Sequence, residues 1–341
     1  MADERACPIE KLTKAMPSPD MAGGQDERNG SHSEHSDQVR TGGGLIARAR
    51  IAAVADGGAT QITECWGQAP LLVRPTTQGV HLVGGAAGPL GGDVLDCHVD
   101  VGDRAQLQVS SVAATLVRPS RTAAPSRYTV TARVGSSGHL LWTPHPLVAC
   151  SGCDHRSTVS IDLAATGAVF WVDIAVLGRH DEPGGTLISR RSVNLDGRPI
   201  NRHELRLGLP AHGMNGPAVT GCARVVASCL VVNPEWSSFP WTDPSSRHNF
   251  VLSGHESDAG GAQTGGPQRD TSALAGHTTG RDARGPRVGL VPLAAAPAVE
   301  ILGFAGSVGE LLESWDLLAT SFARRAPETA KMLRAYVRTN R

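Results

Sequence analysis

The sequence predicts a mainly β protein: stacked β-sheets that form an elongated, β-solenoid-like body, with C-terminal helices packed against it. Three observations carry this prediction. Apolar and polar residues alternate through much of residues 43–252, which is the period of half-buried strands. A short block recurs at a spacing of about 30 residues, the scale of stacked supersecondary units. Only near the C-terminus does the apolar period become helical.

Composition divides the chain into four segments. Residues 1–42 are rich in Gly, Ser, Asp, Glu and His without a sustained apolar period, so they cannot offset the entropy lost on ordering. We expect a disordered tail there, and a flexible Gly- and Ser-rich loop at residues 253–286. We expect residues 43–252 to form the β-rich body, and residues 287–341 to add a strand and a helical pair to the same domain.

Strict alternation marks the strands of the body, each with one apolar face. The apolar positions are Leu95, Cys97, Val99 and Val101; Leu107 and Val109; Tyr128, Val130, Ala132 and Val134; and Val159, Ile161 and Leu163. Further along, Asp196-Gly197 separates two strand-like runs, and this dipeptide is the preferred two-residue hairpin turn because both positions tolerate positive φ. We therefore expect a β-hairpin at this point.

The recurring block aligns without gaps in three copies: VGDRAQLQV (101–109), VGSSGHLLW (134–142) and LAATGAVFW (163–171). Each copy ends one strand, turns on small residues and begins another. Small-residue turns occur in any β protein, but the fixed spacing favours an elongated stack of β layers over a simple sandwich.

Two helices are expected at the C-terminus. The first carries an apolar stripe, and Ser307 with Glu310 forms a capping-box signature before it. The second begins near Pro327, a residue suited to a first helical turn. The apolar residues are Val308, Leu311, Leu312, Trp315, Leu318 and Phe322 in the first helix and Leu333, Tyr336 and Val337 in the second. Such a stripe is most simply core, with an exposed partner face as the alternative.

Charge and composition exclude several classes of function. The 32 basic and 32 acidic residues give a net charge of zero, and aromatic residues make up only 4%, so nucleic acid and anionic membranes are not expected as partners. The start has charges and a proline where a signal peptide needs an apolar core, and no apolar run is long enough to cross a bilayer. Seven cysteines, an odd and scattered set, are expected to be reduced thiols. We therefore expect a cytoplasmic protein.

The stretch GGAAGPLGGD (84–93) could cradle a phosphate or form a structural bend. The three lysines, Lys11, Lys14 and Lys331, lie far from it, so a P-loop is excluded. The residues after Asp93 alternate as a strand and open no helix, which also excludes a dinucleotide fingerprint. We interpret the stretch as a strand-entry turn in which Asp93 caps or hydrogen-bonds the backbone.

The motif CSGCDH supplies Cys150, Cys153 and His155, residue types that suit Zn²⁺ or Ni²⁺. Metal contact by these three residues is one hypothesis; buried or adventitious thiols are the simpler one. A redox CxxC is less favoured because no βαβ pattern surrounds it. No catalytic arrangement is present, neither a Gly-x-Ser-x-Gly elbow nor a His-Glu-x-x-His helix, so catalytic residues are not predicted.

The run PLLVRPTTQGVHLVGGAAGPLGGDVLDCHVDVGDRAQLQVSSVAATLVRPS (70–120) resembles the UreD family of urease accessory proteins, also called UreH. In that family a Gly-Gly-x-x-Gly-Gly-Asp-like turn precedes a strand, a small-residue turn and a Thr- and Ser-rich strand. The segments GHLLWTPHPLVACSG, GAVFWVDIAVLGR and SVNLDGRPINRHELRL follow in the family's order. The resemblance covers roughly residues 45–235 and, less clearly, the final helices, for which it implies contact with UreF. Its strength lies in the order of the motifs.

The sequence departs from the family pattern at several positions. Leu141 stands where the family usually has Glu, and His145 where an acidic residue is common. The tyrosine usual after Ala-Thr is absent, since Leu116 and Val117 follow Thr115. These departures leave open whether acidic residues at these positions guide metal in this chain. They also leave open whether this is a divergent, inactive copy.

The resemblance implies a non-enzymatic accessory protein that binds apo-urease and UreF, and UreG through UreF, and assists delivery of Ni²⁺. A dimer of such complexes is an option, and no tightly bound cofactor is implied, only transient Ni²⁺. We hypothesise a nickel path lined by Ser110, Ser111 and Thr115, with Asp93 at its entrance. The alternatives are a β-stack binding module unrelated to nickel and a thiol-metal enzyme centred on Cys150 and Cys153.

Overall fold

The computed structural model describes residues 40–41, 44–77, 79–120, 124–208, 220–234, 286–293, 297–322 and 327–340. The expected tail therefore lies outside the described residues except for a short strand at Arg40–Thr41, and the expected loop lies outside them except for Pro286. Among the described residues, no helix combines the length and the apolar character needed to cross a membrane.

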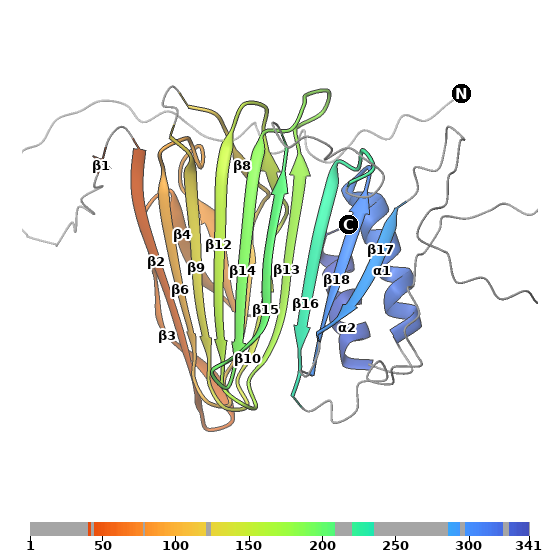
Figure 1. Ribbon diagram of the computed structural model, residues 1–341. Coiled ribbons are helices and arrows are strands. Elements are labelled where there is room, and N and C mark those ends of the chain that lie inside the picture. Colours follow the sequence, from red (N-terminus) through yellow and green to blue (C-terminus); the bar gives the residue numbers. More distant parts are fainter. Residues whose placement is uncertain are drawn as a thin grey trace, which may run out of the picture. The chain divides into compact units, whose positions relative to one another are not determined.

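Two β-sheets form the body of the described unit, and the chain passes repeatedly from one to the other (Figure 1). The first sheet contains β1 (Arg40–Thr41), β2 (Gly44–Asp56), β3 (Ala59–Gly67), β6 (Val94–Val101), β9 (Ser126–Val134), β12 (Asp154–Leu163), β14 (Thr186–Leu195) and β15 (Arg198–Leu207). The second contains β4 (Leu71–Thr76), β5 (Gly79–Gly84), β7 (Gln106–Ser111), β8 (Thr115–Val117), β10 (His139–Thr143), β11 (Leu147–Ala149), β13 (Ala168–Leu177), β16 (Val225–Val232), β17 (Arg287–Pro292) and β18 (Ala298–Ala305). The predicted class, mainly β with stacked coils and C-terminal helices, is confirmed.

The coils stack in parallel and in the register that the repeated block predicts. In the first sheet Val101 lies beside Val134, which lies beside Leu163. In the second sheet Trp142 lies between Val109 and Trp171. The first and ninth positions of the three copies therefore form continuous rows, because each block carries the chain from one sheet into the other.

The parallel stack ends in antiparallel strands. The hairpin expected at Asp196-Gly197 joins β14 to β15, with φ of 50° and 70° at its two turn residues. In the second sheet β16 runs antiparallel to β13 and is followed by β18 and then β17. The C-terminal segment thus contributes two strands where the sequence predicted one, because the proline-containing run 287–305 reverses direction after Pro292.

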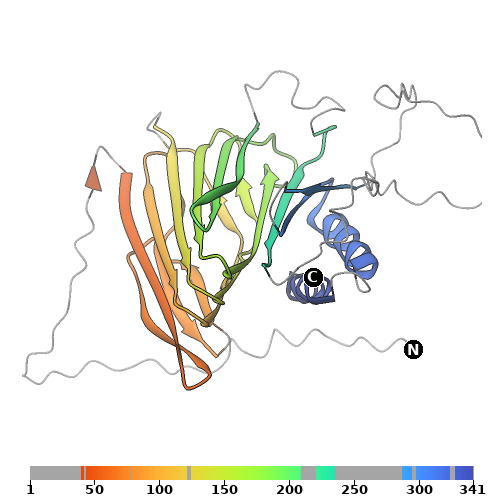
Figure 2. The same cartoon turned by 60° about the horizontal axis from the view of Figure 1, so that its bottom comes forward.

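Two main clusters of buried apolar residues stabilise this arrangement. One lies between the sheets and includes Ile51, Val99, Leu140 and Ile161. The other lies between the outer face of β13, β16 and β18 and the two helices, α1 (Val308–Phe322) and α2 (Pro327–Asn340) (Figure 2). The expected apolar stripe is confirmed as core for Leu311, Leu312, Trp315 and Leu318 and for Leu333, Tyr336 and Val337, which are buried. Val308 is partly buried against the same cluster, and the side chain of Phe322 lies outside those described.

The expected Ser307 cap at the start of α1 is confirmed, and the Glu310 side chain reaches back to the residue before the cap. The Glu310 amide donates to Ser307 Oγ at 3.2 Å, and the Glu310 carboxylate accepts from the Gly306 amide at 3.0 Å. Replacing Ser307 by Ala removes the acceptor for one end-of-helix amide, so we expect the free energy of unfolding to fall by about 1 kcal/mol. Urea unfolding of the variant checks this value, and a Thr320→Ala variant, altered within the helix, serves as the control. No loss in Ser307→Ala would contradict the assigned cap.

Candidate functional site

A cavity of about 410 Å³ lies between the two sheets. Trp142 and Trp171 form part of its wall, and their rings stack with centroids 4.5 Å apart and planes within 4°. Loop residues Ala86–Pro89 and Val112–Ala114 also line it, together with Thr115 and Leu116 of β8, and several of these are exposed. The cavity therefore extends from these loops to the buried tryptophans.

Inward-facing polar residues of the first sheet form part of an otherwise mostly apolar cavity wall. Tyr128, Ser157 and Ser189 occupy one row across β9, β12 and β14. Four residues further along each of these strands, the positions on the same face are the apolar Ala132, Ile161 and Val193. Serine side chains fill less space than branched apolar ones, so this row lines open space that the apolar rows would fill.

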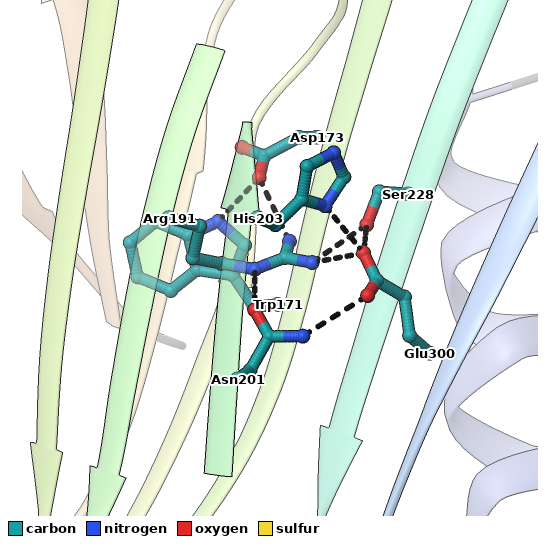
Figure 3. Close-up of polar contacts among 7 residues, drawn as sticks. All are labelled: Trp171, Asp173, Arg191, Asn201, His203, Ser228 and Glu300. Carbon is teal, nitrogen blue, oxygen red and sulfur yellow. Dashed lines mark hydrogen bonds and ion pairs between the residues drawn. The ribbon is translucent and has the colours of Figure 1, made fainter. Parts of the chain in front are cut away.

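At one side of the cavity, a buried polar cluster joins the two sheets (Figure 3). Arg191 of β14 donates to the carboxylate of Glu300 on β18, and its side chain is only 3% exposed. Glu300 also accepts from Ser228 Oγ at 2.8 Å and from Asn201 Nδ2 at 3.0 Å. His203 Nδ1 lies 2.8 Å from the Glu300 Oε1 atom. Both carboxylate oxygens of Glu300 are thus engaged.

These contacts determine the charge state of Glu300. Burial by itself would raise the pKa of this carboxyl, but the hydrogen bond from His203, the charge of Arg191 and the hydrogen bond from Ser228 hold the pKa at about 2. Glu300 is therefore a structural anion, and its charge is fully used within the cluster.

Asp173 differs from Glu300 because one of its oxygens is left for the cavity. Its Oδ2 accepts from Trp171 Nε1 at 2.9 Å and from Arg191 at 3.2 Å. Its Oδ1 makes no contact with another described residue in Figure 3, and 37% of the side chain is exposed where Asp173 lines the cavity. Burial raises the pKa of Asp173, and the Arg191 charge and the Trp171 hydrogen bond oppose that rise. A carboxylate oxygen is therefore available inside the cavity.

The structure separates the four residues of the hypothesised path. Ser111 and Thr115 line the cavity, whereas Ser110 and Asp93 do not. The separation follows from strand alternation, because Val109 points into the core between the sheets and Ser111 shares its face while Ser110 points the other way. Ser111 Oγ accepts from the His145 amide at 2.9 Å and donates to the Ala113 carbonyl at 3.0 Å.

Asp93 is a buried backbone anchor. Its carboxylate accepts from the Leu45 amide at 2.9 Å and from the Leu90 amide at 2.8 Å. The interpretation of GGAAGPLGGD as a strand-entry turn with a hydrogen-bonded aspartate is confirmed by these contacts. Since both Asp93 oxygens are bonded, the role at a path entrance stays a prediction without a contact that supports it.

Cys150, Cys153 and His155 are all buried, and the structure does not gather them as a set of metal ligands. His155 Nδ1 lies 2.8 Å from Ser126 Oγ, and burial lowers the pKa of the imidazole to about 4. Burial raises the pKa of both thiols, that of Cys153 to about 12. Within the described ranges, no three His, Cys, Asp or Glu side chains are placed to share a metal ion. The six cysteines located in those ranges are free thiols, as expected.

Sequence reasoning missed the polar cluster. Asp173 and Arg191 interrupt apolar positions of otherwise regular strands, and Glu300 interrupts the run AVEIL. These interruptions were the available signal.

The residues that depart from the family pattern lie in two places. His145 and Leu116 line the cavity, whereas Leu141 packs beneath the helices on the opposite face of β10.

Comparison with known proteins points to one family. A family model described as "UreD urease accessory protein" matches residues 46–275. The chain is 42% identical over 177 residues to a urease accessory protein UreD of Frankia alni, covering 47% of this chain and 59% of that protein. It is 39% identical over 222 residues to the UreD protein of a Parafrankia species, covering 58% and 75%. For UreD of Streptomyces coelicolor the identity is 38% over 205 residues, covering 58% and 81%.

Proposed function

Because the chain belongs to the UreD family of urease accessory proteins, we propose that it is a non-enzymatic chaperone that binds apo-urease and helps deliver Ni²⁺ to its active site. The observation that carries the proposal is the cavity between the sheets, with the Asp173 carboxylate and several hydroxyl groups in its wall. The metal ion is here a cargo that passes through the protein.

The chemistry of the wall suits a transient cargo. Asp173 offers one unengaged oxygen, and Ser111, Thr115, Ser157 and Ser189 add neutral oxygen atoms. Carboxylate and hydroxyl oxygens bind Ni²⁺ less tightly than a closed set of thiolates and imidazoles does. An ion with such contacts can be handed on, whereas a closed site would retain it. Arg191 and Glu300 compensate each other and fix the position of Asp173.

The proposal includes UreF as a direct partner and UreG as a partner that joins through UreF. The C-terminal helices are the proposed contact for UreF, as the family resemblance implies. The inner stripe of α1 is core, so the contact must use its outer face, where Leu317 is 63% exposed. Deleting the helices would uncover the apolar outer face of β16 and β18 and is therefore a poor test.

A paired substitution tests the passage. Ser111→Leu places a bulky side chain in the cavity, whereas Ser110→Leu places the same side chain on the other face of β7. We expect Ser111→Leu to lower nickel content and urease activity at least about tenfold when urease is matured with the variant, because the path is narrowed. Ser110→Leu should change both by less than about twofold. The measurements are nickel per urease active site and ureolytic rate in cells lacking the wild-type accessory protein.

Folding and partner binding are the controls for this pair. Both variants should keep the wild-type unfolding midpoint within a few degrees and should co-purify with UreF. Ser189→Leu, which obstructs the cavity from the first sheet, is a second obstructing variant in case Ser111→Leu fails to fold. Full maturation of urease by a folded Ser111→Leu or Ser189→Leu protein would refute the passage.

A further inference from the structure

The outer face of the first sheet presents a regular array of side chains above β9 and β12. The strands β9 and β12 are neighbours (Figure 1). Outward positions alternate along each strand, and the parallel register places each one beside its counterpart on the next strand. Thr129 pairs with Thr158 and Thr131 pairs with Ser160, and β14 continues the second of these rows with Ser192. We call these five residues the hydroxyl face. Two arginines, Arg127 and Arg156, border it.

Arg127 and Arg156 are register partners on adjacent strands, so their Cβ atoms are about 5 Å apart. Both side chains are exposed, and neither has an ion pair or hydrogen bond to the rest of the described chain. Like charges directly opposite each other on neighbouring strands are destabilising. The pair therefore costs stability that no described contact offsets.

Three other arginines of the same face form ion pairs with carboxylates. Arg50 contacts Glu64 at 2.7 Å and Asp100 at 3.0 Å. Arg190 and Arg206 both contact the Glu204 carboxylate, at 2.5 and 2.6 Å. The contrast shows that the sheet can pair exposed arginines with carboxylates. Among the described residues no carboxylate forms an ion pair with Arg127 or Arg156, although Asp96 and Asp154 occupy neighbouring outward positions.

The hydroxyl face supplies donors and acceptors next to this charge. None of its five hydroxyl groups makes a hydrogen bond with another described residue. The backbone amides of the strands beneath are used in the sheet ladders. A ligand on this surface would therefore be bound by guanidinium and hydroxyl side chains.

We propose that Arg127, Arg156 and the hydroxyl face form a docking site for a carboxylate-rich segment of a partner protein. Guanidinium groups bind carboxylates through two parallel hydrogen bonds, and the hydroxyls donate to further carboxylate oxygens. The uncompensated charge of the pair is complementary to such a segment. The inference is independent of nickel passage, because this face lies outside the sheets and the cavity lies between them.

The same face disfavours phosphate polymers. Asp96 and Asp100 lie on the adjacent strand β6 and Asp162 lies on β12 itself, and they would repel a long polyanion. Phosphate sites also commonly use free backbone amides at loops or helix ends, and the central strands offer none. A protein segment with carboxylates confined to one end fits this distribution of charge.

The test uses the full chain and a fluorescently labelled peptide with three glutamates at one end and a neutral Gly- and Ser-rich remainder, titrated by anisotropy at low salt. We expect saturable binding that weakens at least about tenfold in the Arg127→Gln/Arg156→Gln variant. The control variant, Arg48→Gln/Arg133→Gln, removes the same charge from exposed positions elsewhere on this face. It should weaken binding by less than about threefold, because it leaves the adjacent pair intact.

Three outcomes would overturn the inference. One is the absence of saturable binding by the wild-type chain, and another is an equal loss in both double variants, which would indicate only general electrostatic attraction. The third is stronger competition by inorganic phosphate or a short single-stranded DNA than by unlabelled peptide, since it would assign the surface to a phosphate ligand. Each titration is accompanied by a thermal unfolding curve, and both variants should remain folded because the changed side chains are exposed.

Discussion

Replacing Glu300 by Gln is expected to lower the free energy of unfolding by about 3 to 5 kcal/mol. The substitution keeps the shape of the side chain, so the packing of β18 against β16 is preserved. It removes the charge that compensates Arg191, whose side chain is 3% exposed, and it turns an acceptor of hydrogen bonds from Ser228 and His203 into a poorer one. Among the described residues, the guanidinium then keeps Asp173 as its one carboxylate partner. Urea unfolding followed by circular dichroism measures the loss.

An exposed ion pair provides the matched control. Glu64 contacts Arg50 at 2.7 Å, and their side chains are 43% and 39% exposed. Solvent screens such a pair, so Glu64→Gln should cost no more than about 1 kcal/mol. If Glu300→Gln proved as mild as Glu64→Gln, the cluster would have to be far more hydrated than its burial indicates.

The stability contributed by Glu300 should also depend on pH. Its pKa in the folded protein is about 2, below the ordinary value of 4.5, so the folded state favours the ionised carboxyl. This contribution is complete above about pH 4.5 and is lost as the pH falls toward 2. The difference in stability between the wild-type chain and Glu300→Gln should therefore shrink over that window. A constant difference from pH 6 to pH 3 would contradict the depressed pKa.

The stacked fold could be predicted because its information is local and repeated. In a parallel stack, residues with the same place in successive coils become neighbours, so VGDRAQLQV, VGSSGHLLW and LAATGAVFW align in sequence as they do in space. Alternation also distinguishes two serines that the path hypothesis grouped together. Leu107 and Val109 face the core between the sheets, so alternation along β7 places Ser111 on that same face and Ser110 on the opposite face.

The polar cluster could not be predicted in the same way. Arg191 and Glu300 are 109 positions apart, and they meet only because β18 returns beside β16 after a long segment. Neither residue belongs to the repeated block, so no periodicity connects them. A long segment separates β16 from the C-terminal strands, and its length does not determine the register in which β18 pairs with β16. That register depends on the assembled sheet.

The second large effect is expected from Trp171→Ala, which should lower the free energy of unfolding by about 3 to 5 kcal/mol. Trp171 is fully buried and stacks on Trp142, so truncation leaves a void beside the existing cavity. It also removes the indole that donates to Asp173 at 2.9 Å. Thermal and urea unfolding measure the loss, with Trp66→Ala as the control because Trp66 is 47% exposed.

Trp171→Phe separates the two consequences of losing the indole. Phenylalanine retains an aromatic ring against Trp142 but cannot donate to Asp173, so it should recover part of the stability while leaving Asp173 with Arg191 as its remaining donor. Because the Trp171 hydrogen bond lowers the pKa of Asp173, its removal should raise that pKa further, which a carboxyl titration by NMR can follow. If the carboxyl titrates identically in both proteins, the indole serves packing alone, and Asp173 owes its position in the cavity to Arg191.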